Sequence, residues 1–165
     1  MKNTIYLGLG SNVGDRAENI ISALSLLQSS LFVNVKKISS FYATSPIGPK
    51  QRGFYNIVIK AQTDLSPNDL LSLIKQSEHI LGRVKTVKWG PRIIDIDILF
   101  FGKKNINNSN LIIPHKEIQN RLFVLAPLSE IAINFIHPGL KRKIIDILCS
   151  KSLILKNQNV KIMRV

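Results

Sequence analysis

Apolar and polar residues follow two different periods along the chain, and the changes of period mark the expected elements. Thr4 to Leu9 is a short apolar run rich in β-forming residues, which predicts a strand. Gly10 to Asn12 predicts a turn after it. Asp15, with Glu18 three residues later, has the pattern of a helix start with a capping box. The apolar residues of this helix recur near the helical period, at Ile20, Ile21, Leu24, Leu27 and Leu31.

The middle of the chain shows the same change from strand to helix. Three further strands are predicted at residues 32–42, 54–62 and 93–101. Residues 43–53 carry two Pro and two Gly, which predicts a loop. Ser66 and Pro67 suit the N-cap and the first position of a second helix, and Gly82 is placed to end it.

These elements predict a ferredoxin-like α+β sandwich, because their order is β-α-β-β-α-β. Residues 102–165 form a C-terminal extension to it. In this extension, residues 111–113 predict a short strand, 116–131 short helical turns and 143–149 a helix. The final stretch is open between strand and tail. A length of 165 residues predicts a single domain over 1–165.

Composition narrows the classes of protein that remain. Lys and Arg number 23 against 10 Asp and Glu, so the net charge of +13 favours an anionic partner: nucleic acid, a membrane surface or a small phosphate compound. A hydrophobic content of 45% excludes wholesale disorder. The single cysteine, Cys149, excludes an intramolecular disulfide and a Cys-based zinc site. We find no signal-peptide or membrane-span pattern, and we expect a cytoplasmic protein.

Asp95 and Asp97 carry the clearest chemical signal. In a strand, residues two apart point to the same face, and the opposite face here is apolar, with Ile94, Ile96 and Ile98. Two neighbouring carboxylates repel each other and resist burial. One interpretation is a Mg²⁺ site that takes its other ligands from water and a substrate phosphate. The other is a solvent-facing pair bonded to nearby Arg, and the spacing alone leaves both open.

The loop before this strand favours the phosphate interpretation. It holds four cations and no acid: Arg83, Lys85, Lys88 and Arg92. The guanidinium group of arginine can form two parallel hydrogen bonds to phosphate oxygens. Metal-binding carboxylates beside a cationic loop are typical of a phosphoryl-transfer site. Trp89 in the loop suits stacking, a hinge or simple packing. His115 follows Pro114 and suits either a structural hydrogen bond or a phosphate contact.

Three other classes of site, a dinucleotide-binding motif, a P-loop and an RNA-recognition module, fit the sequence less well. Gly8 to Gly14 has the spacing G-x-G-x-x-x-G, one residue too long for a dinucleotide fingerprint, and no P-loop motif occurs. An RNA-recognition module shares the β-α-β-β-α-β order, and Arg52 to Phe54 begins its motif. Asn56 stands where that motif needs a second aromatic residue, however, and about a third of the chain lies outside such a module.

Residues 5–133 closely resemble the 6-hydroxymethyl-7,8-dihydropterin pyrophosphokinase family. The motifs occur in order as Gly8-x-Gly10-Ser11-Asn12, Ser39-Ser40-Phe41-Tyr42-x-Thr44-x-Pro46-x-Gly48, Phe54-x-Asn56, Gly82-Arg83, Trp89-Gly90-Pro91-Arg92-x-x-Asp95-x-Asp97-Ile98, Pro114-His115 and Arg121-x-Phe123-x-x-x-Pro127-Leu128. The block from Trp89 to Ile98 is the most specific. The resemblance implies a ferredoxin-like fold and transfer of the β,γ-diphosphate of ATP to the dihydropterin hydroxymethyl group, with release of AMP.

The resemblance also implies roles for individual residues. The expected catalytic residues are Arg83, Arg92, Asp95 and Asp97, of which Asp95 and Asp97 hold two Mg²⁺ ions. The expected ATP contacts are Glu78, Arg83, Lys85, Trp89, Arg92, Ile98, His115 and Arg121. The expected pterin contacts are Thr44, Ser45, Ile47, Phe54, Asn56, Asp95 and Phe123, with the ring between Phe54 and Phe123. The partners implied are ATP and the dihydropterin, with no nucleic acid or membrane, and we expect a monomer.

The sequence departs from the family pattern on the nucleotide side. Lys85 and Lys88 stand where Arg is more usual, so the positive charge remains but the bidentate hydrogen bonding of a guanidinium group is lost. Lys75 stands where other members can have Gln, and Asn110, Ile112 and Lys116 also differ from well-known members. The sequence also leaves two other functions open, an RNA-binding module and a two-metal nucleotidyltransferase that would release pyrophosphate.

Overall fold

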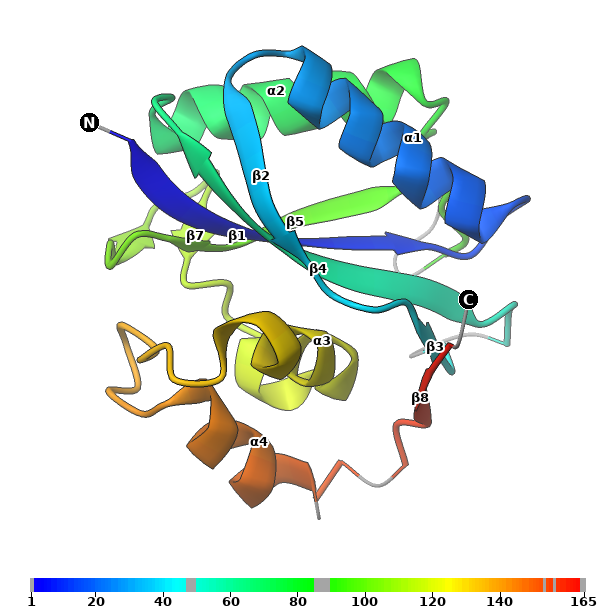
Figure 1. The fold of residues 1–165 in the computed structure, drawn as a ribbon. Helices are drawn as coiled ribbons and strands as arrows, with labels where there is room; N and C mark the ends of the chain where they lie inside the picture. Colours follow the sequence, from blue (N-terminus) through cyan, green and yellow to red (C-terminus); the bar gives the residue numbers. More distant parts are fainter. Residues whose placement is uncertain (1, 47–49, 85–89, 153, 156, 164–165) are drawn as a thin grey trace.

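A six-stranded sheet lies between two helical layers (Figure 1). The computed structural model describes residues 2–46, 50–84, 90–152, 154–155 and 157–163. Helices α1 and α2 cover one face of the sheet, and α3 and α4 lie against the other (Figure 1). No helix in these ranges is long and apolar enough to cross a membrane.

The sheet is antiparallel at every pairing between its named strands. Its order is β5 (Asp95–Phe101), β1 (Asn3–Ser11), β4 (Phe54–Thr63), β3 (Tyr42–Thr44) and β8 (Val160–Ile162), and β2 (Val33–Ile38) also pairs with β4. A separate two-stranded sheet is formed by β6 (Ile106–Asn107) and β7 (Ile112–Ile113). The central strand β1 therefore lies directly between β4 and β5, which places residues distant in sequence side by side.

The two helices on one face of the sheet, α1 and α2, begin where the sequence predicts. In front of α1 (Arg16–Ser29), the Asp15 carboxylate accepts hydrogen bonds from the backbone N–H groups of Ala17 and Glu18. In front of α2 (Pro67–Ile80), the Ser66 hydroxyl accepts from the N–H of Asp69. These bonds satisfy donors that a helix start leaves unpaired. After α2 the chain leaves the helix at Gly82, whose φ is +82°, and this left-handed conformation favours glycine.

The helical layer formed by α3 and α4 contains more regular helix than the sequence indicates. The expected short turns over 116–131 are a 3₁₀ turn, η1 (Ile118–Asn120), and an eleven-residue helix, α3 (Leu122–Ala132), with Pro127 inside it. Helix α4 (Ile144–Ser152) follows. The final stretch, open between strand and tail, contains β8, the edge strand beside β3.

Two boundary predictions are wrong. Gly10 and Ser11 are not a turn but the end of β1, paired with Asn56 and Tyr55. The expected strand over 32–42 is two strands, because residues 39–41 do not continue the regular pairing with β4. Within β2, the register with β4 also shifts between Val35 and Lys37. Such a shift bends a strand and interrupts its pairing.

The break between β2 and β3 is held by polar side chains. The Ser39 hydroxyl accepts from the N–H of Val58 at 2.9 Å. Glu130 of α3 accepts from the Ser40 N–H at 3.0 Å and from the Tyr42 hydroxyl at 3.1 Å. Burial, and then the charge of Glu130, raise the pKa of Tyr42 to about 12. Glu130 thus ties the start of β3 to the lower helical layer.

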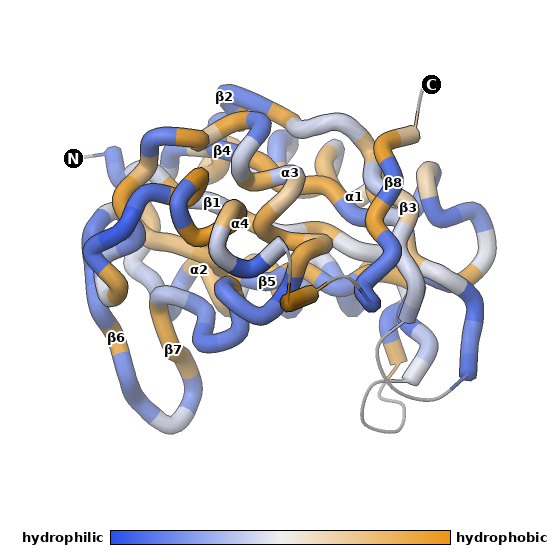
Figure 2. Tube along the Cα trace, turned by 90° about the horizontal axis from the view of Figure 1, so that it is seen from below, coloured by the Kyte–Doolittle hydropathy of each residue, from blue (hydrophilic) through white to orange (hydrophobic). Residues whose placement is uncertain are grey.

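Each face of the sheet has its own core. Ile94, Ile96 and Ile98 are buried on the α1/α2 side, as the strand alternation predicts. Leu99 and Phe100 pack on the α3/α4 side, and a register shift between β1 and β5 accompanies this change of side. Figure 2 shows apolar stretches along the central strands and α3, with polar residues at the tip of the β6–β7 hairpin. Asp95 and Asp97 therefore face the α3 side, at the start of β5.

Candidate active site

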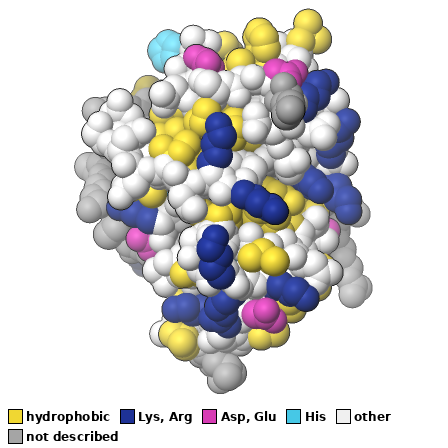
Figure 3. Space-filling view, turned by 90° about the vertical axis from the view of Figure 1, so that its left-hand side faces the viewer, with side chains coloured by type: hydrophobic (Ala, Val, Ile, Leu, Met, Phe, Trp, Pro, Cys, Tyr) yellow, Lys and Arg dark blue, Asp and Glu magenta, His cyan; other side chains and the backbone are white. Residues whose placement is uncertain are grey.

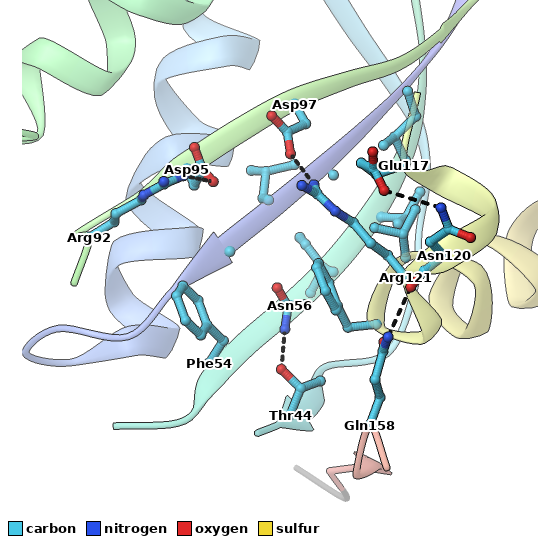
Figure 4. A pocket seen from close by; sticks show the side chains of 18 of the residues that line it. Thr44, Phe54, Asn56, Arg92, Asp95, Asp97, Glu117, Asn120, Arg121 and Gln158 are labelled. Atoms are coloured by element: carbon cyan, nitrogen blue, oxygen red, sulfur yellow. Dashed lines mark hydrogen bonds and ion pairs between the residues drawn. The ribbon is translucent and has the colours of Figure 1, made fainter. Parts of the chain in front are cut away.

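A cavity of about 520 Å³ opens between the sheet and the start of α3 (Figure 4). Side chains from β3, β4 and β5, from the segment leading into α3, and from the C-terminal segment surround it. Its volume suits a small molecule or part of a larger ligand. Both aspartates that the sequence singles out line this cavity.

The floor of the cavity is made by two glycines of β1. Gly8 pairs with Asp97, and Gly10 pairs with Asp95 on one side and Asn56 on the other. A Cβ atom on Gly10 would lie 2.7 Å from Oδ1 of Asn56, which is too close for any L side chain to fit without movement. The glycines therefore leave room above the strand, between the carboxylates of β5 and the amide of β4. The sequence pattern predicts a turn at Gly10 and gives no sign of this floor.

Asp95 is held by two arginines that approach from either side of the 85–89 range. Arg83 Nη1 lies 2.7 Å from Oδ1 of Asp95, and Arg92 Nη1 lies 2.5 Å from Oδ2. Each of these side chains keeps about a quarter of its surface exposed. Arg92 lines the cavity, whereas Arg83 contacts Asp95 from outside the lining and also pairs with Glu78. Both guanidinium groups are partly exposed, so a phosphate could share them.

Asp97 has weaker partners. Arg121 Nη1 lies 3.4 Å from its Oδ2, and His115 Nε2 lies 3.9 Å from the same atom. Burial, and then the charge of Asp95, raise the pKa of Asp97 above its usual range, while His115 and Arg121 act in the opposite direction. The surroundings therefore satisfy the ionised form of Asp97 poorly, and a cation at this point would stabilise that form.

His115 is oriented by the backbone. Its Nδ1 accepts from the N–H of Glu117 at 3.2 Å, so Nε2 is the atom turned toward Asp97. Burial is the main cause that lowers the pKa of His115, and the charge of Asp97 opposes it. A neutral His115 then carries its proton on Nε2 and can donate a hydrogen bond toward the cavity.

Glu78, an expected ATP contact, lies behind the arginines. It is 2% exposed and accepts from the Ile96 N–H at 2.8 Å, from Lys75 Nζ at 2.9 Å and from Arg83. Its carboxylate thus joins α2, β5 and Arg83. The Ile98 side chain, another expected contact, is buried on the α1/α2 side, so the cavity is not lined by it.

The opposite half of the cavity is aromatic and amide in character. Phe54 and Phe123 line it together with Thr44, Ser45 and Asn56. Asn56 is buried and its Nδ2 donates to the Thr44 hydroxyl at 2.8 Å (Figure 4). The Asn56 amide oxygen and second N–H are then available for a ligand edge. The structure thus brings together the residues expected for a pterin, apart from Ile47.

Some expected residues fall outside the described ranges. Ile47, Lys85 and Trp89 belong to this group, as does Lys88. Arg83 and Arg92 stand on either side of the 85–89 range.

Other residues at the cavity were not foreseen. Lys116, Glu117, Asn120 and Gln158 also line it. Lys116 adjoins His115, and its position in a basic turn was a usable signal. Gln158 had none, because it lies in the C-terminal stretch whose structure the sequence left open.

The two carboxylates fit a metal that comes with its substrate better than a resident one. Among the residues that the structure describes, no group of three or more His, Cys, Asp or Glu side chains is arranged to hold a metal ion. Mg²⁺ is commonly bound by one or two carboxylates, with waters and substrate phosphates as its other ligands. Asp95 and Asp97, side by side above the glycine floor, match this donor set.

Comparisons with known proteins agree with this geometry. Residues 6–133 match the family described as 7,8-dihydro-6-hydroxymethylpterin-pyrophosphokinase (HPPK). A 2-amino-4-hydroxy-6-hydroxymethyldihydropteridine pyrophosphokinase from Bacillus subtilis is 47% identical over 132 residues, which is 79% of each chain. One from Aquifex aeolicus is 46% identical over 136 residues, 82% of this chain and 84% of that one.

The chain also matches parts of longer proteins. It spans 38% of the bifunctional protein FolKE from Lactococcus lactis, at 46% identity. The crystal structure of Plasmodium falciparum HPPK-DHPS wild type with pteroate superposes with a TM-score of 0.75 at 18% identity, over 98% of this chain and 47% of that one; at this identity the match shows the fold alone. The family match and the identity to the Bacillus and Aquifex enzymes show that this chain belongs to the 7,8-dihydro-6-hydroxymethylpterin-pyrophosphokinase family.

Proposed function

We propose that this protein transfers diphosphate from ATP to 6-hydroxymethyl-7,8-dihydropterin, giving AMP and the dihydropterin diphosphate. The observation that carries the proposal is the division of one cavity into two chemically different halves. One half is charged: it is lined by Asp95, Asp97, Arg92 and Arg121, and Arg83 pairs with Asp95 from outside the lining. The other half is lined by two aromatic rings and by polar groups, from Phe54, Phe123, Asn56 and Thr44. The Gly8–Gly10 floor joins them.

The charged half suits a triphosphate. Arg83 and Arg92 can exchange part of their contact with Asp95 for forked bonds to phosphate oxygens. Arg121 and the Nε2–H of His115 approach from the α3 side. Charge would thus reach the phosphates from two directions, which holds the transferred group in line and stabilises its developing charge. Lys85 and Trp89 remain proposed ATP contacts from the family resemblance, as do Glu78 and Ile98.

The aromatic half suits a pterin. Two phenylalanine side chains line this half, and their π faces could stack on a flat heteroaromatic ring. Asn56 can both donate and accept at the ring edge, and its bond to Thr44 fixes which way its amide points. Ser45 lies beside Thr44 at the same edge, and Ile47 completes the proposed pterin contacts. The pterin hydroxymethyl group would then point along the glycine floor toward Asp95 and Asp97.

We further propose that Asp95 and Asp97 hold two Mg²⁺ ions brought with ATP. When bound, Mg²⁺ neutralises phosphate charge and polarises the phosphoryl oxygens. The protein's own part is to orient the reactants: Asn56 and the two phenylalanines set the hydroxyl position, and the arginines set the phosphate position. Such positioning places little demand on a strong general base.

The proposal extends to the fold family, the domain organisation, the oligomeric state and the location of the protein. The pairing order β5-β1-β4-β2 supports a ferredoxin-like arrangement, to which β3, β8 and the lower helices are additions. We propose that residues 1–165 act as one domain and as a monomer in the cytoplasm. The substrates are small molecules, without nucleic acid or a membrane.

Product identification tests the proposed function. With ATP, Mg²⁺ and the hydroxymethyl dihydropterin, we expect equal amounts of AMP and dihydropterin diphosphate by chromatography. Release of ADP would contradict diphosphate transfer, and release of pyrophosphate would indicate a nucleotidyltransferase. Tight binding of single-stranded RNA without Mg²⁺, with a steep dependence on salt, would instead support an RNA-binding module.

A further inference from the structure

The C-terminal segment reaches back to the active-site cavity. Gln158 lies beyond residue 133, where the family match ends, yet it lines the cavity. Strand β8 follows directly and pairs with β3, with Val160 opposite Thr44. The Ser45 N–H donates to the Asn159 carbonyl at 3.2 Å, and the Met163 N–H donates to the Phe41 carbonyl at 2.8 Å. The segment is therefore attached along the strand that carries Thr44.

Gln158 connects this strand to the start of α3. Its Oε1 accepts from the Leu122 N–H at 2.8 Å. Its Nε2 donates to the Asn120 carbonyl at 2.9 Å (Figure 4). Both ends of one amide thus hold the backbone on either side of Arg121. The residues held here are adjacent to Arg121, which faces Asp97, and to Phe123, which lines the cavity.

The start of α3 depends on an outside partner for this N–H group. Arg121 occupies the N-cap position and makes no side-chain capping hydrogen bond. The first N–H groups of a helix have no acceptor within the helix. Gln158 supplies one to Leu122, the first residue of α3, from a segment 36 residues away in the chain. Gln158 thus both caps the start of α3 and lines the cavity.

We propose that Gln158 is a positioning residue for pterin binding: its amide fixes the start of α3, and with it Phe123, relative to the Thr44–Asn56 edge. The proposal rests on the proposed function, since it assigns the aromatic half of the cavity to the pterin. Gln158 acts through Asn120 and Leu122, and the C-terminal segment thereby becomes one wall of the binding site. Thr44 and Phe123 belong to separate elements, and the β8–Gln158 connection joins them.

The test compares Gln158→Ala with Asn159→Ala, an exposed neighbour in the same segment. We expect Gln158→Ala to weaken binding of 6-hydroxymethylpterin about five- to thirty-fold by calorimetry, the size of losing one helix cap. Affinity for ATP should fall less than affinity for the pterin, because Arg121 belongs to the segment that Gln158 holds but Arg83 and Arg92 lie on other elements. The control should bind both ligands like the wild type. Equal weakening for pterin and ATP, or unchanged pterin affinity, would overturn the proposal.

A second variant separates positioning from general loss of structure. Gln158→Glu keeps an acceptor for the Leu122 N–H but loses the donor to Asn120. Its pterin affinity should therefore fall between those of the wild type and Gln158→Ala. Amide hydrogen exchange at Leu122 should be faster in Gln158→Ala and near wild type in Gln158→Glu. Unchanged exchange in both variants would contradict the proposed clamp, by which we mean the two hydrogen bonds from Gln158 to Asn120 and Leu122. If the wild type forms no AMP, the proposed function fails, while the exchange data still decide whether the clamp exists.

Discussion

At the scale of single residues, the site depends on one poorly satisfied acid and on two positions without side chains. Asp95 has two arginines within 2.7 Å, whereas Asp97 has its nearest cation at 3.4 Å. Gly8 and Gly10 lie opposite these acids on β1. A site that must receive phosphates and cations gains from open space and unneutralised charge, and both features work against the stability of the ligand-free protein.

Asp97→Asn should separate activity from stability. Removing this carboxylate takes away a proposed Mg²⁺ ligand, so turnover should fall by about 100-fold or more. It also removes a charge that burial and Asp95 destabilise, so the melting temperature of the ligand-free protein should stay equal or rise. Steady-state AMP formation and thermal unfolding measure the two effects.

Asp95→Asn is the matched comparison for that experiment. Arg83 and Arg92 would lose their common carboxylate, so this variant should lose turnover and also melt at a lower temperature. The interpretation of Asp97 as the poorly satisfied acid would be wrong if both variants destabilised the protein equally.

Gly10→Ala should damage the pterin half of the site. The new methyl group would lie 2.7 Å from Oδ1 of Asn56 and displace the amide that bonds Thr44. We expect pterin affinity to fall at least about tenfold, as for a lost buried hydrogen bond to a ligand. In Gly8→Ala the atoms nearest to the methyl group belong to Leu99, at 3.6 Å, an ordinary van der Waals contact, so the loss should stay within about threefold. Calorimetric titration with 6-hydroxymethylpterin gives both values, and a larger loss in Gly8→Ala would refute the argument.

At the scale of elements, polar side chains fasten segments that regular pairing does not. Glu130 joins α3 to the start of β3, and Gln158 joins the C-terminal segment to the other end of α3. The loop between α3 and α4 uses His137 in the same way. Its Nδ1 accepts from the N–H groups of Gly139 and Leu140, both at 3.1 Å, and its ring packs edge-on against Phe100.

Because of His137, we expect the folded protein to be less stable in mild acid. Burial lowers the pKa of His137, although its backbone hydrogen bond acts the other way. The neutral ring is therefore favoured in the folded state, and its contribution is full above the unfolded value of about 6.5. As the pH falls from about 7 to about 5, the unfolded chain takes up the proton first, so the free energy of unfolding should decrease.

Urea unfolding at several pH values measures this effect. In His137→Asn, which keeps an acceptor oxygen, the decrease should be smaller than in the wild type. His79→Asn, a change at an exposed histidine of α2, serves as the control. If His137→Asn and His79→Asn had equal slopes with pH, His137 would not be the titrating group.

At the scale of the whole molecule, positive charge extends well beyond the site. Figure 3 shows Lys and Arg distributed over one face with few acids among them. Only a few of the 23 Lys and Arg residues have a task in the site. Their number first pointed to an anionic partner of unspecified kind, and the family shows that this partner need not be a polymer.

Excess charge of one sign should make stability depend on salt. Self-repulsion at a net charge of +13 opposes the compact state. Raising NaCl from about 0.02 M to about 0.3 M shortens the screening length and should raise the melting temperature of the ligand-free protein. KCl should act equally if screening is the cause. A melting temperature that falls with salt would mean that attractive ion pairs, such as those of Arg83 and Arg92, outweigh the repulsion.

Local rules determined much of this protein from the sequence alone. The helix starts at Asp15 and Ser66, the end of α2 at Gly82 and the two faces of the Asp95–Asp97 strand depend only on near neighbours, and the structure has them as predicted. The pairing of Asp95 and Asp97 on one face follows from strand geometry. The motif block that contains them was specific enough to indicate the family.

Tertiary structure alone decided how the cavity is enclosed. Gly10 became a floor residue because β1 lies between β4 and β5, and Gln158 became a wall residue because β8 pairs with β3. The break between β2 and β3 likewise depends on Glu130, 90 residues away from Ser40. Contacts between such distant segments leave no periodic signal in the sequence, since they depend on which strands become neighbours and not on the residues beside them.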